Sequence, residues 1–257
     1  ARREGPVKVL RHASEGFRAL PGAAELEAQH DPRAPYVHYI SNETVEGVQF
    51  HRTVGRGDVL RVCDMSSDFL SRPFEIEDFA IVYAHAQKNL GPAGVTVVLI
   101  RDDIVDRVPD GLPAMMDYRE HVRMGSVYNT PPVFSIYVTM LVSRWLRNDV
   151  GGLEAMQAVN AIKAASLYAA LDASDGFYRG HAAVADRSLM NVAFRLPTPA
   201  LEQQFLDEAR ARGLHGLDGH RSLGGLRASL YNAVSIEAVD ALCAFMGDFR
   251  AAHAPGG

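Results

Sequence analysis

The chain has 257 residues, of which 47% are hydrophobic and 22% are charged, and its formal net charge is −5. This is ordinary composition for a globular protein with enough apolar side chains for a sizeable core. The sequence pI near 6.1 argues against a nucleic-acid binder, because no basic stripe is available to neutralise phosphates.

The first half of the chain contains several short apolar runs, whereas residues 1–35 are weakly patterned and give no firm prediction. Near-continuous Val, Ile and Leu in the later runs predicts strands that are buried on both faces, as in a helix-covered α/β sheet. We predict strands at 36–40, 45–50, 59–63, 79–83 and 95–100, with a polar turn at 41–44.

The second half follows a different pattern after an irregular polar stretch, residues 101–130. Pro131-Pro132 opens a long helix, 133–149, since proline is tolerated in a first turn, and Gly151-Gly152 ends it. The pattern beyond it predicts a helix at 153–173, a strand at 189–195, a helix at 198–212, a strand at 226–231 and a helix at 235–252. We therefore predict two domains: residues 1–152 with a mainly parallel central sheet, and residues 153–257 as a smaller α+β domain.

Several functional classes lack their signals. The longest apolar stretch, residues 134–142, is too short to span a bilayer. Cys63 and Cys243 sit in apolar runs and are interpreted as buried thiols, so we expect a reducing, cytoplasmic location. The ten histidines show no zinc spacing, and the chain has neither a Walker A loop nor a GxGxxG motif, so no metal site is predicted.

Lys88 is the most informative residue. It follows the apolar run 79–83 and precedes Gly91 and Gly94, so its amine should be partly desolvated, which lowers the pKa and makes it a usable nucleophile and base. Asp64 ends the neighbouring run. A pyridoxal phosphate (PLP) enzyme needs this pair, the lysine for a covalent bond to the aldehyde and the carboxylate for the pyridinium nitrogen. A solvated surface lysine and an N-capping aspartate remain the alternatives.

Two further segments could bind anions. Asn129 and Thr130 precede a helix, where they could cap it or approach a phosphate. His220 and Arg221 lie in a glycine-flanked loop that is either a basic surface loop or an anion site. Arg227 lies inside a strand-like run, where an unpaired charge is costly, so we expect it to have an anionic partner.

Six ordered blocks carry a family resemblance that runs from about Tyr36 to about His253. They are Asn42-Glu43-Thr44, Asp64-Met65-Ser66-Ser67 with Leu70-Ser71-Arg72-Pro73, residues 86–94 (AQKNLGPAG), residues 125–132 (GSVYNTPP), residues 187–191 (RSLMN), and Gly219-His220-Arg221 with residues 227–233 (RASLYNA). On these blocks the chain resembles the phosphoserine aminotransferases, PLP-dependent class V enzymes of fold type I.

The resemblance implies a role for each matching residue. Lys88 would bond to PLP and then carry a proton, and Asp64 would pair with the ring nitrogen. Thr44 would contact the 3′ oxygen region and Gln87 the cofactor phosphate. Asn129 and Thr130 would reach that phosphate from the other subunit of a homodimer. Arg227 would bind the substrate α-carboxylate, and His220 and Arg221 would hold the distal phosphate or the glutamate side chain.

The implied reaction moves an amino group from L-glutamate to 3-phosphohydroxypyruvate, giving O-phospho-L-serine and 2-oxoglutarate. It belongs to serine biosynthesis, and the analogous phosphohydroxythreonine step of pyridoxine synthesis is also compatible. The family carries a further N-terminal stretch of about a hundred residues, the size of a small domain, with a phosphate loop, a stacking aromatic ring and a His-Arg pair. The chain lacks these, so residues 1–152 are expected to form only part of the PLP-binding domain.

Two alternatives stay open. One is another class V aminotransferase of fold type I, against which the basic loop at 219–221 argues. The other is a chain that no longer catalyses, and that binds PLP weakly or serves in dimerisation.

Overall fold

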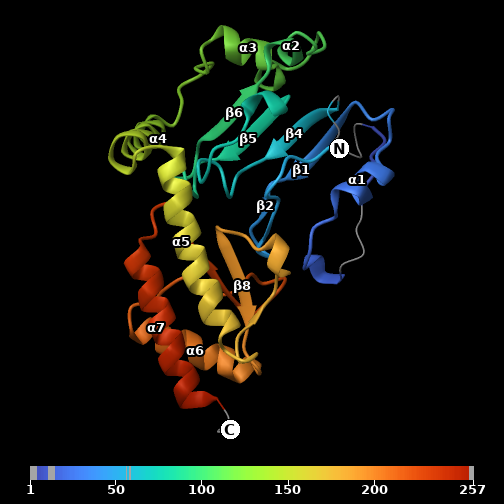
Figure 1. The fold of residues 1–257 in the computed structure, drawn as a ribbon. Coiled ribbons are helices and arrows are strands. Elements are labelled where there is room, and N and C mark those ends of the chain that lie inside the picture. The colour runs from blue at the N-terminus through green and yellow to red at the C-terminus, as the bar shows by residue number, and fades with distance from the viewer. Residues whose placement is uncertain (1–4, 11–14, 56, 58, 255–257) are drawn as a thin grey trace.

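The computed structural model describes residues 5–10, 15–55, 57 and 59–254. Its upper part, as drawn in Figure 1, contains a four-stranded sheet in the order β1-β4-β5-β6. β1, β4 and β5 pair in parallel and β6 is antiparallel to β5, so the predicted mainly parallel sheet is confirmed. The four strands are β1 (Tyr36–Ile40), β4 (Leu60–Asp64), β5 (Ile81–His85) and β6 (Thr96–Ile100).

The two faces of this sheet differ in burial. One face packs on a core that includes Cys63, Val82 and Ala84, all at most 1% exposed. On the opposite face Tyr36 and Ile40 are 49% and 37% exposed, because no helix in the described part of the chain buries them. The prediction that these strands are buried on both faces is therefore wrong for this chain.

A small hairpin follows β1 where a polar turn was expected at 41–44. It consists of β2 (Asn42–Glu43) and β3 (Val48–Gln49). The turn lies between these strands, at residues 44–47, so the turn predicted at 41–44 was placed too early. Gly47 ends the turn at φ 71°, and a Cβ there would come within 2.6 Å of the Asn191 carbonyl oxygen. Only glycine allows the hairpin to lie this close to the C-terminal part of the chain.

The connection between the two parts is helical, as predicted. α4 (Val133–Trp145) continues into the π-helical turn η4 (Leu146–Val150), which ends at Gly151 with φ 96°. α5 (Leu153–Asp172) then runs down into the C-terminal part (Figure 1). Among the described helices, none combines the length and the apolar character needed to cross a membrane.

The C-terminal part is an antiparallel sheet, in the order β7-β8-β9, with α5, α6 and α7 around it (Figure 1). Phe194, Phe205, Phe245 and Phe249 form its fully buried centre, with neighbouring ring centroids 4.8–6.1 Å apart along the cluster. Its other elements are β7 (Arg179–Gly180), β8 (Asn191–Arg195), α6 (Pro199–Ala211), β9 (Leu226–Ser229) and α7 (Ile236–His253).

Short helical segments complete the described chain. They are η1 (Glu15–Phe17), α1 (Ala23–Gln29), η2 (Ile76–Asp78), α2 (Asp102–Val105), η3 (Ala114–Met116), α3 (Tyr118–Arg123) and η5 (Val184–Asp186). α2 and α3 lie within the stretch that was predicted to be irregular.

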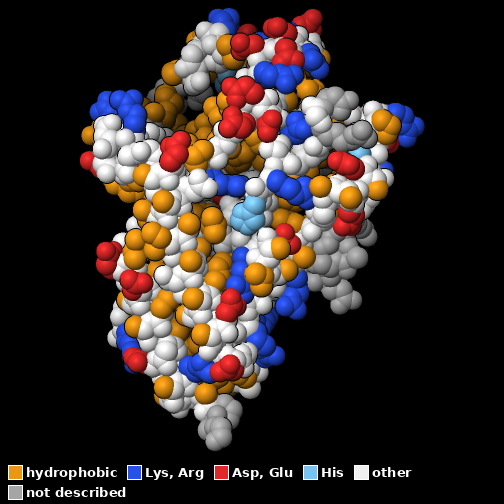
Figure 2. Space-filling model, viewed as in Figure 1, with side chains coloured by type: hydrophobic (Ala, Val, Ile, Leu, Met, Phe, Trp, Pro, Cys, Tyr) orange, Lys and Arg blue, Asp and Glu red, His pale blue; other side chains and the backbone are white. Residues whose placement is uncertain are grey.

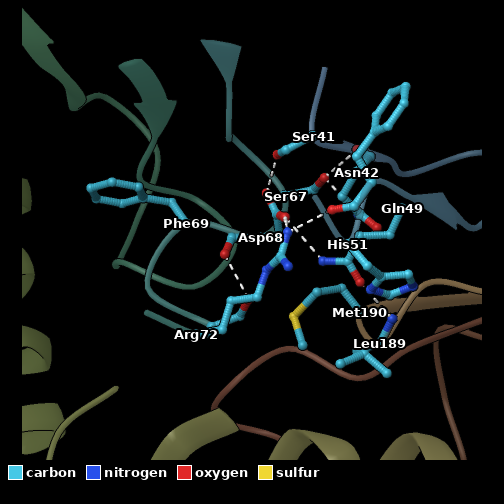
Figure 3. A network of polar contacts seen from close by, with 12 residues as sticks. Ser41, Asn42, Gln49, His51, Ser67, Asp68, Phe69, Arg72, Leu189 and Met190 are labelled. Carbon is cyan, nitrogen blue, oxygen red and sulfur yellow. Dashed lines mark hydrogen bonds and ion pairs between the residues drawn. The ribbon is translucent and has the colours of Figure 1, made fainter. Parts of the chain in front are cut away.

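A buried polar network joins the two parts of the chain (Figure 3). Asn42 Nδ2 donates to Asn191 Oδ1 at 2.9 Å, and the Leu189 amide donates to Gln49 Oε1 at 2.9 Å. Gln49 Nε2 in turn donates to Asp68 Oδ2 at 3.0 Å. Burial raises the pKa of Asp68, so its carboxylate depends on these donors and on Arg72, 3.6 Å away, to remain charged. The hairpin is thus fixed to β8 and to the turn after β4.

Lys163 on α5 is fully buried, and no carboxylate pairs with it among the described residues. Its ammonium instead donates to the carbonyl oxygens of Leu230, Tyr231 and Val234, at 3.0, 3.0 and 2.9 Å. These carbonyls belong to the segment that follows β9, so Lys163 holds that segment against α5. Burial lowers the pKa of Lys163 to about 8.

Lys163→Met should change how stability depends on pH. Between about pH 8 and the ordinary lysine pKa near 10.5, the unfolded wild-type chain binds more protons than the folded chain, so its free energy of unfolding rises with pH. The variant should lose this rise, and at pH 7 it should be about 2–3 kcal/mol less stable because three carbonyls lose their donor. Urea unfolding across this pH range measures both effects. The exposed Lys8→Met is the control, and identical profiles for the two variants would contradict the assignment.

Candidate functional site

Lys88 lies in a tight turn directly after β5. Ala86 anchors the turn, since its carbonyl accepts the amides of Leu90 and Gly91, at 3.1 and 2.8 Å. Gly91, at φ 154°, packs directly on α4, where a Cβ would come within 3.1 Å of Thr139 Oγ1. The turn therefore projects Lys88 from the carboxyl end of the sheet, and the glycine is required by the helix that packs on it.

Asn89 fixes this turn to the surrounding structure. Its side-chain amide donates to the Phe69 carbonyl oxygen at 3.1 Å, and its Oδ1 accepts the Asn232 amide at 3.0 Å. Asn232 also donates to the Leu70 carbonyl oxygen at 2.9 Å. Because Asn89 is only 7% exposed, these bonds are shielded from water, and the residue next to Lys88 is held by both parts of the chain.

Thr44 meets Lys88 from the hairpin. Lys88 Nζ donates to Thr44 Oγ1 at 2.6 Å, although 44 positions separate them in the sequence. The Gly47 carbonyl accepts the Ser188 amide at 2.9 Å, which holds the hairpin turn in this place. The structure thus brings two of the predicted site residues into direct contact.

Asp64 is the last residue of β4 and is the third predicted site residue near Lys88. Its Oδ1 accepts the Ser66 amide at 2.8 Å, which stabilises the turn after the strand and is the local role expected of an aspartate there. The carboxylate also acts on Lys88, since its charge raises the lysine pKa. Asp64 therefore serves the turn and the site together, and the two interpretations of this residue do not exclude each other.

The pKa of Lys88 lies below the ordinary lysine value. Burial of the partly buried ammonium is the main cause, and the positive charge of Arg227 acts in the same direction. The carboxylates of Asp64, Asp68 and Glu43 oppose the shift. A lysine with a lowered pKa is a better amine nucleophile and base, which agrees with the chemistry expected of Lys88.

Arg227 on β9 faces the same site. Its guanidinium donates weakly to the Thr44 carbonyl oxygen at 3.4 Å, and its buried Nε has no hydrogen-bond partner among the described residues. The anionic partner that we expected for this arginine is therefore not supplied by the described part of the chain. A partly buried guanidinium with a free N–H is suited to receive a carboxylate.

The remaining predicted residues lie outside this cluster of contacts. Gln87 is exposed, and Asn129 and Thr130 are exposed in the segment before α4. α4 begins after Pro132 without a side-chain cap, so the alternative that Asn129 or Thr130 caps it is wrong. His220 is partly exposed and bonds to Ser222 Oγ at 2.7 Å, and Arg221 is exposed beside it.

The sequence analysis did not single out Glu43 or Tyr83. Glu43 lies between Asn42 and Thr44. Burial raises its pKa, the charge of Asp64 adds to this shift, and the charge of Lys88 opposes it. Tyr83 lies opposite Asp64 in the parallel register of β4 and β5, and burial together with the charge of Asp64 raises the pKa of Tyr83 to about 12. A signal for Tyr83 was available, because it is the middle residue of a short strand whose alternate positions share one face. No sequence signal identified Glu43.

The comparisons with known proteins agree with this arrangement. The model of the family Aminotransferase class-V matches residues 2–242. The chain belongs to this family. Curated phosphoserine aminotransferases from Geobacillus kaustophilus, Herpetosiphon aurantiacus and Rhodopirellula baltica are 54%, 50% and 48% identical to it. The matches cover 87%, 93% and 97% of this chain but only 62%, 65% and 66% of those proteins, so the chain spans less than two thirds of their length.

Solved structures show the same relationship. Phosphoserine aminotransferase from Bacillus circulans subsp. alkalophilus matches with a TM-score of 0.89 and 48% identity, over 92% of this chain and 65% of that one. The PLP-bound enzyme from Trichomonas vaginalis matches with a TM-score of 0.80 and 39% identity, over 85% and 61% of the two chains. An aspartate aminotransferase from Thermus thermophilus shares the fold, with a TM-score of 0.74 at 18% identity. The predicted PLP-dependent aminotransferase fold is confirmed.

The Lys88 environment can be tested without any ligand. Asp64→Asn removes the carboxylate whose charge most favours the ammonium, so the pKa of Lys88 should fall further below its ordinary value. NMR titration of isotope-labelled lysine measures this in a chain with only three lysines, and Lys88→Met assigns the signal. Asp240→Asn, exposed on α7, should leave the titration unchanged. A Lys88 signal that Asp64→Asn does not move would show that the two groups are not coupled.

Proposed function

We propose that this chain contributes the lysine, the ring-nitrogen carboxylate and the substrate arginine of a PLP-dependent phosphoserine aminotransferase. The observation that carries the proposal is the convergence of Lys88 on Thr44, Asp64 and Arg227 from four separate segments. The donor set fits PLP. It provides an amine of lowered pKa for the aldehyde, a carboxylate for the ring nitrogen and, for an anion, a guanidinium whose buried Nε has no partner among the described residues.

In the proposed site each residue has one task. PLP, when bound, holds the transferred amino group and withdraws electrons from the bond that breaks. Lys88 binds the cofactor aldehyde through Nζ and, once free, moves the proton at the substrate Cα. Asp64 orients the ring nitrogen, Thr44 contacts the 3′ oxygen region, and Gln87 contributes to the phosphate contacts. Arg227 binds the α-carboxylate, and His220 and Arg221 hold the distal anionic group of the substrate.

The proposed substrates are L-glutamate and 3-phosphohydroxypyruvate, which would place the protein in serine biosynthesis, with a further use in pyridoxine synthesis. The curated relatives, all named phosphoserine aminotransferases, support this choice at about 50% identity. The basic pair at 220–221, in which Arg221 is exposed, supports a phosphorylated substrate over an unphosphorylated one.

We also propose a homodimer in which Asn129 and Thr130 complete the partner's site. Both are exposed, and no described contact ties them to the Lys88 group of their own chain. α4, which follows them, has no buried residue, and its Val133 and Phe134 are 65% and 75% exposed. Hydrophobic side chains are also visible over α5 in Figure 2, where Ile162 is 50% exposed. Such apolar surface is typical of an interaction site.

The domain boundary near residue 152 is kept as a proposal. Gly151 and Gly152 separate α4 from α5, and the core around Val82 is distinct from the core around Phe205. The segment before α1 nevertheless contacts the C-terminal part, since the Ala183 amide donates to the Arg18 carbonyl oxygen at 2.6 Å. A cytoplasmic location is proposed on the two free cysteines, of which Cys63 is buried.

Covalent capture of PLP tests the proposal directly. After incubation with PLP and reduction with borohydride, peptide mass spectrometry should find the label on Lys88 and not on Lys8 or Lys163. Lys88→Ala should abolish the label, and Lys8→Ala should retain it. L-glutamate added to the unreduced complex should give about one equivalent of 2-oxoglutarate per bound PLP. The reaction should stop there, because without an acceptor the cofactor keeps the amino group.

The outcomes separate the alternatives. A label on Lys88 without 2-oxoglutarate would mean that this chain binds the cofactor but does not transfer the amino group. No specific label on a folded chain would contradict the proposed function of this chain.

Arg221→Ala tests the phosphorylated substrate. Loss of a charge-assisted contact should reduce kcat/KM for 3-phosphohydroxypyruvate about tenfold to a hundredfold, and for L-glutamate much less. Arg107→Ala removes an exposed arginine in the segment after α2 and is the control. Equal losses for the two substrates would remove the argument that this loop selects a phosphate.

A further inference from the structure

Three asparagine side chains form a cluster at the turn that follows β4. They come from the Lys88 turn, from the segment after β9 and from α5, and each is at most 7% exposed. Each donates to a different one of three consecutive carbonyl oxygens: Asn89 to Phe69 at 3.1 Å, Asn232 to Leu70 at 2.9 Å and Asn160 to Ser71 at 3.1 Å.

The members of this asparagine cluster are also bonded to one another. Asn160 Nδ2 donates to Asn232 Oδ1 at 2.9 Å, and the Asn232 backbone amide donates to Asn89 Oδ1 at 3.0 Å. A carboxamide side chain can make several such bonds because it carries two N–H donors and an acceptor oxygen. The cluster is therefore continuous from the Lys88 turn, through the segment after β9, to α5.

The turn that receives these bonds has an unusual backbone conformation. Leu70 has φ 59°, in the left-handed region that bulky side chains rarely adopt. Such a conformation persists only where the surrounding contacts impose it, and it is typical of functional sites. Here the contacts include the three asparagine bonds, which go to the carbonyl of Leu70 and to those of its two neighbours.

The cluster joins the segments that carry the charged residues of the proposed site. Lys88 directly precedes Asn89, and Arg227 precedes Asn232 on the segment that leaves β9. Asp64 ends β4, just before the turn that receives the three bonds. The bond between Asn89 and Asn232 therefore connects the segment that carries the lysine to the segment that carries the arginine.

We propose that Asn89 is a positioning residue, which holds Lys88 at the distance from Arg227 at which the lysine amine reaches the Cα of a substrate bound to that arginine. This inference rests on the proposed function and deepens it. In that function Arg227 holds the α-carboxylate, which is bonded directly to Cα, so the place of Cα relative to the lysine depends on how the two segments are joined. Proton transfer needs the amine within reach of the proton on Cα, and a displacement of about 1 Å can cost about a hundredfold in rate.

The first test needs no ligand. Asn89→Ala removes the link between the two segments, so the Lys88 turn should separate from the segment after β9. Burial and the charge of Arg227 both lower the pKa of Lys88, so that pKa should rise toward the ordinary lysine value in the variant. NMR titration of isotope-labelled lysine measures the change. Asn160→Ala is the matched control, because it removes two bonds of the same cluster without touching the Lys88 turn, and it should leave the titration unchanged.

The second test uses PLP and L-glutamate. Asn89→Ala should still be labelled by PLP on Lys88 after borohydride reduction. Its rate of 2-oxoglutarate formation at saturating L-glutamate should fall about tenfold to a hundredfold. The half-saturating concentration should change little, because the contacts to the anion remain and only the proton transfer is misaligned. Asn160→Ala should keep most of the wild-type rate.

A second variant covers the case in which Asn89→Ala fails to fold. Asn89→Ser keeps a hydroxyl that can accept from the Asn232 amide, so less of the buried polar contact is lost. Its rate of 2-oxoglutarate formation should fall in the same direction but less, by about threefold to tenfold, the size of one hydrogen bond.

The outcomes distinguish this inference from the proposed function. If Asn89→Ala and Asn160→Ala give the same Lys88 titration and the same rate, Asn89 has only a structural role and the inference is overturned, while the proposed function stands on the wild-type label and product. A loss confined to the affinity for L-glutamate also overturns it. If the wild-type chain gives neither label nor 2-oxoglutarate, the proposed function fails and the inference falls with it.

Discussion

The hydrogen bond from Lys88 Nζ to Thr44 Oγ1 is the interaction on which the site depends. A half-buried ammonium must have an acceptor, and here the acceptor, Thr44, comes from a hairpin 44 positions earlier in the chain. The hairpin reaches Lys88 only because Gly47 lets its backbone lie against Asn191 of β8. The contact between Lys88 and Thr44 therefore depends on how both parts of the chain fold together.

The buried polar network between the two parts of the chain explains why this contact is held in place. Asn42, Gln49 and Asp68 are each at most 5% exposed, and each is hydrogen-bonded to residues from another segment (Figure 3). Asn89 and Lys163 act in the same way on the other side, where they hold the segment after β9. Such groups are costly to bury without partners. The arrangement of the two parts that gives every one of them a hydrogen bond is therefore strongly favoured over other arrangements. The position of Arg227 relative to Lys88 follows from this network.

The sequence predicted the elements where local pattern decides them, and it failed where tertiary contact does. The apolar runs around Val62, Val82 and Val98 and the Gly151 helix end were found to within about two residues, because strand composition and glycine caps are local signals. The hairpin was misplaced because its turn is set by contact with β8 rather than by turn residues. Burial of both sheet faces was wrongly expected, since an apolar run reports what a strand can bury and not what the chain supplies to cover it. For the site, local context identified Lys88 and Asp64, whereas Tyr83 required knowledge of the strand register.

In the proposed site, the charge of Arg227 would link substrate binding to the protonation state of Lys88, because no anion among the described residues pairs with that arginine. Arg227 lowers the pKa of Lys88, and its buried Nε has no partner among the described residues. A carboxylate that pairs with Arg227 neutralises that charge and so increases the proton affinity of the lysine amine. In the proposed reaction the amine must first act as a nucleophile, which needs a low pKa, and later accept a proton from carbon, which needs a higher one. The arginine proposed to bind the substrate would therefore also adjust the lysine pKa between these two tasks.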